Sequence, residues 1–401
     1  MKNEYLRRNY MSDFFKPAIV AIGYNRPDSM QRLLNSIGRS NFHDKDITLV
    51  ISIDNCEKTQ EVVEVAEAFS WEHGNKIIRT FETRQGLRNH ILQCGDLSQK
   101  YGAVIILEDD LVVSPTFYSY TQAALNYYKD NDELAGIALY SHQWNGYAQR
   151  FFFPVSEGND VYFAQFGVSW GQCWSEKQWS SFRSWYESNQ SKLEYTDEIP
   201  NQITNWPETS WGKYFVYYMV EKNKYYIMSY NALATNFTEV GQHAKSSDNT
   251  YQVPLLYGEK DFKFVSYETS VKYDIFFERQ EMEKYFPVEI LKGGVCVDLY
   301  ATKEGYGNNR YLLTTSSKPY KIIKSYGLQM RPQELNIIYN VAGNDIFLYD
   351  METVDKTQNL KNKYNYSLFK YDVRGLTWRQ ALIFGVNEFI KTFKRRFSLK
   401  Q

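Results

Sequence analysis

The sequence predicts an α/β protein in which a mixed, mainly parallel sheet of Rossmann-like type is flanked by helices. Two observations predict this fold. Short apolar runs rich in Val and Ile alternate with segments whose apolar residues recur at helical spacing. The runs are apolar throughout rather than at every second residue, which is typical of strands covered on both faces by helices. The expected strands are 17–22, 47–53, 76–79 and 103–107.

Helices and polar strand ends complete the predicted layout. Pro27 begins the first helix, because proline is favoured in a first turn and the apolar residues after it follow helical spacing. Further helices are expected over 62–69 and 87–97. Ligands of such sheets bind beyond the carboxyl ends of the strands. We therefore expect one crevice to gather the polar residues that follow the strands: Asn25, Arg26, Asp54, Asn55, Glu108, Asp109 and Asp110.

The composition excludes several classes of protein. The 401 residues carry a formal net charge of -1, whereas a general nucleic-acid binder would carry a basic excess. A hydrophobic fraction of 43% argues against disorder. The four cysteines stand far apart, which fits neither a zinc site nor a disulfide framework and favours a reducing compartment. Neither a secretory leader nor an apolar run long enough for a bilayer is visible, so we expect a cytoplasmic protein.

The chain changes character along its length. An N-terminal tail (1–16) precedes the half made of alternating strands and helices (17–115). Residues 116–250 are dense in Trp and Tyr, and residues 251–376 carry strand-like, Tyr-rich stretches that we expect to form an α+β extension. No internal repeat or low-complexity linker separates these segments, so their boundaries are soft.

Residues 377–401 predict a basic amphipathic helix. Its apolar stripe consists of Leu382, Val386, Phe389, Ile390, Phe393 and Phe397. Six basic residues stand against one acidic residue, so the segment carries a charge of +5 and the rest of the chain -6. Such a helix suits an anionic membrane surface, with which it would make a peripheral contact. The alternative is a helix docked on the body with a solvated basic face, and the sequence favours neither.

An acid triplet, Glu108-Asp109-Asp110, follows the last expected strand of the first half. Three adjacent carboxylates repel one another, so such a cluster normally needs a cation. A hard divalent ion takes oxygen ligands and bridges a carboxylate to phosphates. Since no Walker A glycine loop is present, we expect Mn²⁺ or Mg²⁺ on a diphosphate rather than a P-loop site. The alternative is a solvated acidic loop.

The acid triplet and its surroundings resemble the metal-binding segment of GT-A-fold glycosyltransferases. The resemblance is to N-acetylglucosaminyltransferase I and to related bacterial enzymes that build surface polysaccharides. It implies that Asp110 holds the metal, while Glu108 and Asp109 contact the ribose or the donor sugar.

Two earlier segments resemble the same family. Arg26 follows the first strand, and the resemblance implies that it approaches the diphosphate of a sugar nucleotide. Asp54 stands where the family reads the uracil. Residues 86–90 fall where the family has a basic helix near the nucleotide, which implies that Arg88 and His90 bind the donor.

The resemblance continues into the Trp-rich half. Residues 166–171 resemble a loop that closes over the donor sugar, and residues 206–211 match a W-P-x-x-x-W segment that leads to the catalytic base. Trp170 and Trp211 are therefore expected to stack on sugar faces, whereas a Trp cluster on general grounds belongs to a core. His243 resembles a turn that bacterial relatives place near the diphosphate, and its alternative is a structural role.

The chain departs from the family at the catalytic base. Where N-acetylglucosaminyltransferase I has Trp-Asp-Asp, this chain has Trp211-Gly212-Lys213. The nearest carboxylate is Glu208, which would share a face with Gly212 if the segment were helical. We expect Glu208 to act as the base. A surface glutamate at a helix start is the alternative, and Glu239 and Asp248 are less favoured candidates for the base.

The sequence thus predicts a metal-dependent, inverting glycosyltransferase. It would move a sugar from a nucleotide-sugar donor, UDP-linked, to an oligosaccharide or a lipid-linked glycan at the inner face of a bacterial cytoplasmic membrane, in surface polysaccharide synthesis. One alternative is a catalytically degenerate carbohydrate-binding protein of the same fold, which the missing acid keeps open. The other is a sugar-nucleotide pyrophosphorylase, which the lack of a Gly-rich signature after the first strand disfavours.

Overall fold

The structure is a computed structural model of the chain. It describes residues 15–166, 169–191, 193–237, 249–355, 366–373 and 375–398. Three of the predicted site residues, Glu239, His243 and Asp248, lie outside the described residues, as does nearly all of the expected tail 1–16.

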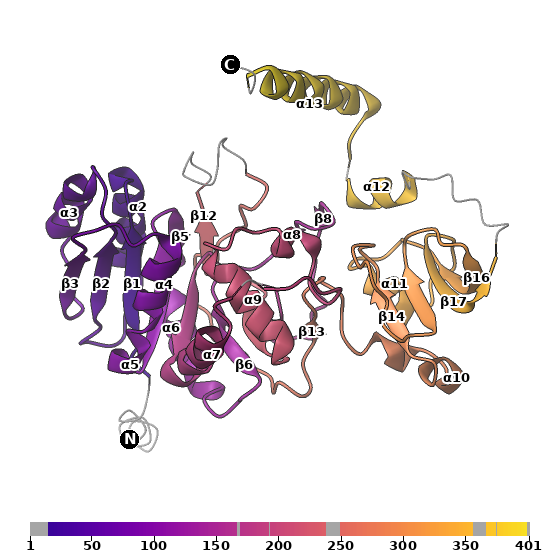
Figure 1. Ribbon diagram of the computed structural model, residues 1–401, viewed down its shortest axis with the longest axis horizontal. Helices are drawn as coiled ribbons and strands as arrows, with labels where there is room; N and C mark the ends of the chain where they lie inside the picture. Colours follow the sequence, from indigo (N-terminus) through magenta and orange to yellow (C-terminus); the bar gives the residue numbers. More distant parts are fainter. Residues whose placement is uncertain are drawn as a thin grey trace.

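Within the described residues, one nine-stranded sheet forms the body, in the order β13-β9-β11-β6-β10-β4-β1-β2-β3 (Figure 1). Its strands are β1 (Ala18–Gly23), β2 (Leu49–Ile53), β3 (Lys76–Thr80), β4 (Ala103–Glu108), β6 (Leu134–Ala138), β9 (Val161–Ala164), β10 (Gln172–Ser175), β11 (Tyr225–Ser229) and β13 (Lys272–Tyr273). The neighbours β3, β2, β1 and β4 run parallel, whereas β10 runs antiparallel to both β4 and β6. The predicted mixed, mainly parallel sheet flanked by helices is confirmed.

Alternate residues of the central strands point into two different cores. Val20 and Ile22 belong to a core with α4 (Leu87–Gly95), α7 (Glu176–Ser188) and α9 (Trp211–Glu221). Ile19 and Ala21 belong to a second core with α2 (Pro27–Gly38), α3 (Thr59–Ala68) and α6 (Phe117–Tyr127). Because side chains alternate between the faces of a strand and helices cover both faces, every position of β1 is apolar or Gly.

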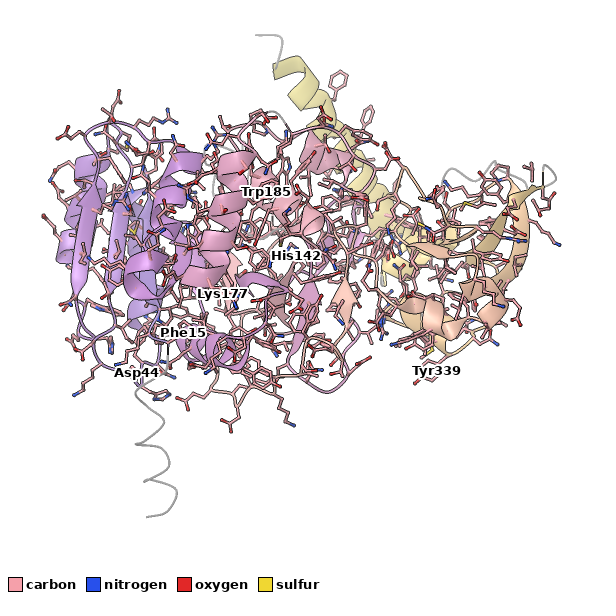
Figure 2. All side chains as sticks on the ribbon, turned by 60° about the horizontal axis from the view of Figure 1, so that its bottom comes forward. Phe15, Asp44, His142, Lys177, Trp185 and Tyr339 are labelled. Atoms are coloured by element: carbon pink, nitrogen blue, oxygen red, sulfur yellow. The ribbon has the colours of Figure 1, made fainter. Side chains whose placement is uncertain are left out.

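The Trp-rich half supplies much of the first core. The ring of Trp174 lies 4.4 Å from that of Trp179 and meets Trp211 edge to face at 5.8 Å. Trp185, on α7, is buried as well and donates its indole N–H to Glu221 (Figure 2). Most of these indoles therefore stabilise the body by burying apolar area, which is the general expectation for a Trp cluster.

The C-terminal extension is α+β, as predicted. A four-stranded sheet with the order β14-β15-β17-β16 has two small cores of its own. Its strands are β14 (Val295–Asp298), β15 (Tyr311–Thr314), β16 (Tyr320–Tyr326) and β17 (Ile346–Val354), and its short helices are η1 (Met282–Tyr285), α10 (Val288–Leu291) and α11 (Glu334–Ile338). The main sheet takes in β13, so the body continues past residue 250, where we expected the extension to begin.

Smaller elements connect these parts. They are α5 (Ser98–Tyr101), β5 (Leu111–Val113), β7 (Trp144–Asn145), β8 (Arg150–Phe151), α8 (Asn201–Thr204), β12 (Ala234–Asn236) and α12 (Tyr366–Asp372). β12 pairs with β5 directly after the acid triplet, and β7 pairs with β8 in a short hairpin.

The predicted basic helix is present as α13 (Trp378–Ser398), which Figure 1 shows apart from the body. The apolar stripe is exposed wherever its side chains are described, and Phe389 has 71% of its surface accessible. The docked alternative is therefore wrong for this part of the helix. Among the described residues, none of the helices has both the length and the apolar content that crossing a bilayer requires.

Candidate active site

Three strands of the body end side by side at one edge of the sheet. β1 pairs in parallel with both β2 and β4, so that Ile22 lies opposite Glu108 and Gly23 lies opposite Ile53. Residues that follow these strands must therefore gather at the same edge. The predicted convergence of Arg26, Asp54 and the acid triplet follows from this register.

Arg26 is bound to the acid triplet. Its Nη2 donates to Oδ1 of Asp109 and lies 3.9 Å from Oδ2 of Asp110, and its Nε lies 3.4 Å from Oδ2 of Asp109. Burial disfavours the charged guanidinium, but the carboxylates of Asp109, Asp110 and Glu108 together raise the pKa of Arg26 above its ordinary value. Asp109 is itself buried and engaged by Arg26, which favours a positioning role over the predicted contact with donor sugar.

The triplet has oxygen atoms that suit a hard cation. Oε1 of Glu108 is buried and accepts no hydrogen bond from the described residues. Burial, followed by the carboxylates of Asp110 and Asp109, raises the pKa of Glu108 well above its usual range. Burial also raises the pKa of Asp109 to about 6, although Arg26 opposes the change. A divalent cation beside Asp110 and Glu108 would relieve this repulsion, so the residues fit the predicted metal.

The protein alone does not complete a metal site in the described residues. No group of three or more His, Cys, Asp or Glu side chains there has the geometry to hold an ion. Asp110 keeps about a quarter of its side chain accessible. Because Mg²⁺ and Mn²⁺ commonly bind one or two carboxylates together with substrate phosphates, a diphosphate would supply the remaining oxygens.

Asp54 holds the loop that leads into α4. Its Oδ1 accepts hydrogen bonds from the backbone N–H of Asn55 (2.8 Å) and Gln85 (2.7 Å), and its Oδ2 accepts from that of Gly86 (2.9 Å). Gly86 adopts a φ of +73°, which glycine reaches without strain. Both carboxylate oxygens are thus occupied in fixing the start of α4, and uracil recognition by Asp54 stays a prediction.

His90 was predicted to bind the donor, but its position in the structure does not fit that role. Its side chain is buried within the sheet side of α4 and shares a 2.7 Å hydrogen bond with the hydroxyl of Ser52, with Phe81 against its ring edge. Burial lowers the pKa of His90 to about 4, so the imidazole is neutral at pH 7. A buried neutral ring with this partner supports the site from beneath and does not reach a donor in this conformation.

Glu208 precedes α9 rather than lying in it. Because α9 begins at Trp211, the prediction that Glu208 and Gly212 share a helical face is wrong. The carboxylate accepts from the Lys213 ammonium (2.6 Å, Oε1) and from the Tyr214 hydroxyl (3.0 Å, Oε2). Arg88 donates to the backbone carbonyl of Glu208 (2.5 Å), which joins α4 to the start of α9.

The two predicted sugar-stacking indoles differ in accessibility. Trp211 is 4% exposed and packs edge to face on Trp174 and Phe215, so its ring has no free face for a sugar, and the prediction is wrong in this conformation. Trp170 is half-buried and contacts Tyr140 and Tyr251, at 4.7 and 5.2 Å between ring centroids. Gly171 next to it approaches Ala234 of β12, the strand beside the acid triplet, so donor contact by Trp170 stays a prediction.

A family model described as the GNT-I family matches residues 88–188, which is 101 of the 401 residues. The matched segment contains Arg88, the acid triplet and Trp170, and it lies within the predicted resemblance. This quarter of the chain is therefore similar to the GNT-I family. The match confirms the resemblance and supports the predicted class of enzyme, a glycosyltransferase. It does not extend to Arg26, Asp54 or Glu208, whose roles rest on geometry alone.

Several solved structures are similar to part of the chain at low identity. The S. aureus TarS 1-349 complex with UDP-GlcNAc is 13% identical, with 58% of this chain and 61% of that chain covered and a TM-score of 0.37. GalNAc-T7 with UDP, GalNAc and Mn²⁺ is 11% identical, over 55% and 43% of the two chains, with a TM-score of 0.35. The mannosyltransferase PcManGT from Pyrobaculum calidifontis, in complex with GDP-Man and Mn²⁺, is 9% identical over 46% and 53%, with a TM-score of 0.30.

These likenesses are too weak to carry functional detail. The chain spans about three fifths of the TarS 1-349 structures that it matches. No curated protein matches the chain significantly.

Several residues of the candidate site were not predicted from the sequence. Lys213 and Tyr214 hold Glu208, and Tyr140 and Tyr251 flank Trp170. Lys213 carried a signal, since it stands where the family has an acid and a buried lysine requires a partner. Tyr140 and Tyr251 carried none, because their contacts with Trp170 join residues far apart in the chain.

Proposed function

We propose that the chain is a metal-dependent glycosyltransferase that uses a UDP-linked sugar donor and inverts the configuration of the transferred sugar. The observation that carries the proposal is the cluster of Arg26 with Glu108, Asp109 and Asp110 at the carboxyl edge of β1 and β4. It combines the positive charge of Arg26 with carboxylate oxygens at the place where α/β sheets bind nucleotides. The GNT-I family match over residues 88–188 supports the same class.

Each residue of the cluster has a proposed task. Arg26 attracts the diphosphate of the donor, and Asp109 holds Arg26 in place. Asp110, with Glu108, would hold Mn²⁺ or Mg²⁺, which neutralises charge on a departing diphosphate. Arg88 fixes the start of α9, through the carbonyl of Glu208, against residues 17–115, which we propose bind the nucleotide and call the nucleotide half.

The acceptor must lose a proton as the glycosidic bond forms. Glu208 is the proposed base, because its carboxylate is partly accessible at the end of α9 that Arg88 ties to the nucleotide half. Because Oε1 of Glu208 lies 2.6 Å from the Lys213 ammonium, an acceptor hydroxyl would compete with Lys213 for this oxygen.

A two-part experiment tests the proposal. Thermal unfolding is measured with UDP, UDP-sugars and GDP-sugars, with and without Mn²⁺, because a ligand that binds the folded state raises Tm. UDP release from the donors is then measured with Mn²⁺ present. We expect a UDP-sugar to raise Tm only with the metal and to release UDP. Stabilisation by a GDP-sugar alone, or by donors equally well without metal, would contradict the proposed donor or the proposed metal.

A second function is favoured by Gly212 and by the pairing of Glu208 with Lys213. The chain would then be a carbohydrate-binding protein that retains the fold and has lost the base. It would bind a UDP-sugar in the thermal assay and release no UDP with any donor or acceptor, which distinguishes it from the enzyme. A sugar-nucleotide pyrophosphorylase, the third possibility, would instead convert a UDP-sugar and added pyrophosphate into UTP and the sugar 1-phosphate.

We further propose a glycan or lipid-linked acceptor at the inner face of a bacterial cytoplasmic membrane, in surface polysaccharide synthesis. The support is α13, whose described apolar side chains are exposed and whose segment 377–401 carries a charge of +5. Truncation after residue 376 should release the protein from vesicles that contain phosphatidylglycerol. Unchanged partitioning of the truncated chain would remove this part of the proposal and leave the donor chemistry intact.

A further inference from the structure

The exposed apolar surface is not confined to α13. α12 precedes it and presents Tyr366 and Phe369, which are 75% and 58% exposed and lie one helical turn apart. Leu376 and Trp378, in the connection and at the start of α13, are exposed as well. Large apolar side chains thus continue from α12 into α13, and a soluble surface rarely carries so many in one stretch.

On α13 itself the exposed apolar residues are not equivalent. Leu382, Val386, Phe389, Ile390 and Phe393 fall on one stripe at 100° per residue. Phe384 is 64% exposed but lies on the other side of the helix, among the sequence positions of Lys391 and Arg395. Phe384 can therefore serve as a control for which face of the helix contacts a membrane.

α12 is attached to the rest of the protein by its last two residues. The Asp372 carboxylate accepts two hydrogen bonds from Arg150, at 2.6 Å to Nε and 3.4 Å to Nη2, and both side chains are largely buried. The hydroxyl of Tyr371 donates to the carbonyl of Met330 (2.8 Å), and the guanidinium of Arg331 lies 4.5 Å from its ring centre. Tyr366 and Phe369 remain exposed although the end of the helix is attached.

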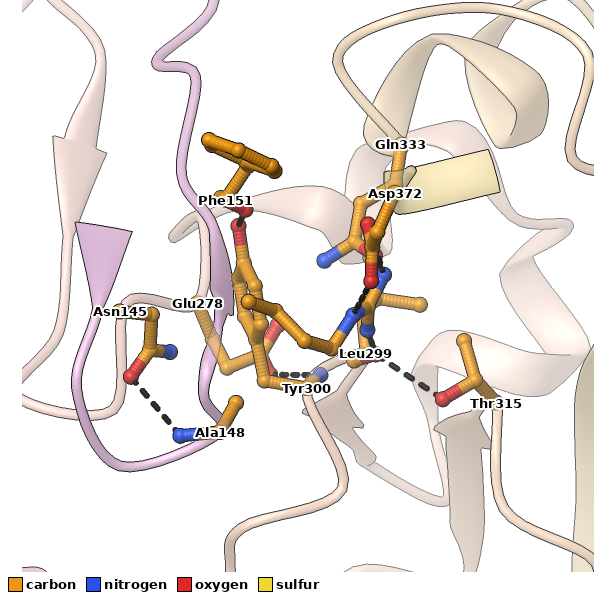
Figure 3. A network of polar contacts seen from close by, with 10 residues as sticks. Asn145, Ala148, Phe151, Glu278, Leu299, Tyr300, Thr315, Gln333 and Asp372 are labelled. Carbon is orange, nitrogen blue, oxygen red and sulfur yellow. Dashed lines mark hydrogen bonds and ion pairs between the residues drawn. The ribbon is translucent and has the colours of Figure 1, made fainter. Parts of the chain in front are cut away.

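Arg150 joins three parts of the structure at once. It lies on β8 of the body and also donates to the carbonyl of Leu299 and to Oε1 of Gln333, both in the C-terminal extension (Figure 3). Its guanidinium lies 5.1 Å from the ring centre of Tyr300, which in turn donates to the carbonyl of Phe151. A planar guanidinium with several fixed partners sets the position of the carboxylate that it binds.

We propose that α12 and α13 together form one surface that lies on an anionic bilayer, and that the Arg150–Asp372 pair fixes this surface to the body. The inference rests on the membrane contact proposed above for residues 377–401 and extends it to α12. The occupant is a bilayer rather than a protein groove, because the apolar residues accompany a strongly basic segment and aromatic side chains, the combination that suits a lipid headgroup interface.

Co-sedimentation of the full chain with phosphatidylcholine vesicles, with and without phosphatidylglycerol, tests the surface. The double variant Tyr366→Ser/Phe369→Ser should bind anionic vesicles about tenfold more weakly, and Phe389→Ser several-fold more weakly, since each removes apolar area from the interface. Phe384→Ser and Tyr339→Ser remove equally exposed aromatics from elsewhere and should bind as the wild type does.

The outcomes distinguish the inferred contact of α12 with the bilayer from the proposed membrane contact of residues 377–401. If truncation after residue 376 abolishes binding and the α12 double variant binds normally, the extension to α12 is wrong and the tail contact stands. If neither change affects binding, both fail. If α13 instead pairs with a second copy, sedimentation velocity without lipid will show a dimer that Phe389→Ser dissociates, and the bilayer is then the wrong occupant.

Hydrogen exchange of residues 366–373 without lipid tests the attachment. Asp372→Asn should raise the exchange rate of α12 by about tenfold or more, because local opening no longer breaks an ion pair. Asp96→Asn is the matched control, since Asp96 forms a similar pair with Arg183 elsewhere in the body. Unchanged exchange in Asp372→Asn would show that Arg150 does not fix α12.

Discussion

Lys213 places its ammonium 2.6 Å from Oε1 of Glu208 and is itself buried at the start of α9. The ammonium also donates to the carbonyl of Trp206 (3.1 Å), so it has two oxygen partners in the same turn. The family that this chain resembles has an acid at the register of Lys213. A cation has thus replaced an acid next to the proposed base, and the first two predictions follow from this exchange.

Glu208→Gln should lower kcat by at least about 100-fold, because a positioned general base typically contributes 10²–10⁴-fold. The Mn²⁺-dependent rise in Tm with a UDP-sugar should be unchanged, since Gln keeps the size of the side chain. Glu221→Gln is the control, because Glu221 lies at the far end of α9 and binds Trp185. Near-normal turnover in Glu208→Gln would remove Glu208 from the role of base.

Gly212→Asp should be tolerated and should stabilise the fold. A Cβ atom at Gly212 meets Trp206 and Ser210 at 3.7 and 3.8 Å, which is ordinary contact. Replacing glycine in the first turn of a helix by an acid should raise the free energy of unfolding by about 1 kcal/mol, measured by urea denaturation. If the missing acid is the family's base, Gly212→Asp should also restore part of the activity that Glu208→Gln loses. If the double variant Glu208→Gln/Gly212→Asp is stable but inactive, an acid at position 212 stabilises the fold and does not act as the base.

Asp110→Asn should abolish the metal-dependent part of donor binding. The neutral amide is a poorer ligand for a hard cation, so the rise in Tm with UDP should no longer depend on Mn²⁺. Asp96→Asn provides a carboxylate variant outside the site, because Asp96 binds Trp179 and Arg183. It should lower stability and keep the Mn²⁺ dependence. Wild-type metal dependence in Asp110→Asn would place the cation elsewhere.

His90 should make the fold less stable in mild acid. Its pKa is lowered to about 4 in the folded state, so between pH 6.5 and pH 4 the unfolded chain binds a proton that the folded chain does not. The stability that depends on the neutral ring is full above pH 6.5 and falls by up to about 3 kcal/mol as the pH drops to 4. His90→Gln should remove this part of the pH dependence in urea denaturation. Equal losses in both proteins would contradict a lowered pKa.

Glu334 should have the opposite pH dependence. Burial raises its pKa to about 7, and its Oε2 accepts no hydrogen bond from the described residues. The folded state therefore holds a proton that the unfolded chain loses above pH 4.5, so stability falls as the pH rises through 7. Glu334→Gln mimics the protonated acid, and its stabilising effect should be near zero at pH 4.5 and reach up to about 3 kcal/mol at pH 8. An effect independent of pH would contradict the raised pKa.

The fold of residues 17–115 was predictable because its signals are local. The strand runs at 17–22 and 103–107 became β1 (Ala18–Gly23) and β4 (Ala103–Glu108), since an uninterrupted apolar run has few alternatives once helices flank it. Arg26 and the acid triplet were predictable as neighbours for the same reason, because parallel strands end at one edge. The helical start of α9 was not predictable to the residue, and this error moved Glu208 off the face of Gly212.

By itself, the sequence determined the layers of the body, the edge where its polar residues gather, and the basic amphipathic character of residues 377–401. The spacing of apolar residues, the composition and the order of the segments carry this information, because each can be recognised from residues close together in the chain. Only the tertiary structure decided which side chains remain accessible. It buried His90 and Trp211, paired Glu208 with Lys213, and joined Arg150 to Asp372 across 222 residues of chain. Such pairings depend on where packed elements meet, and no local pattern of residues records that.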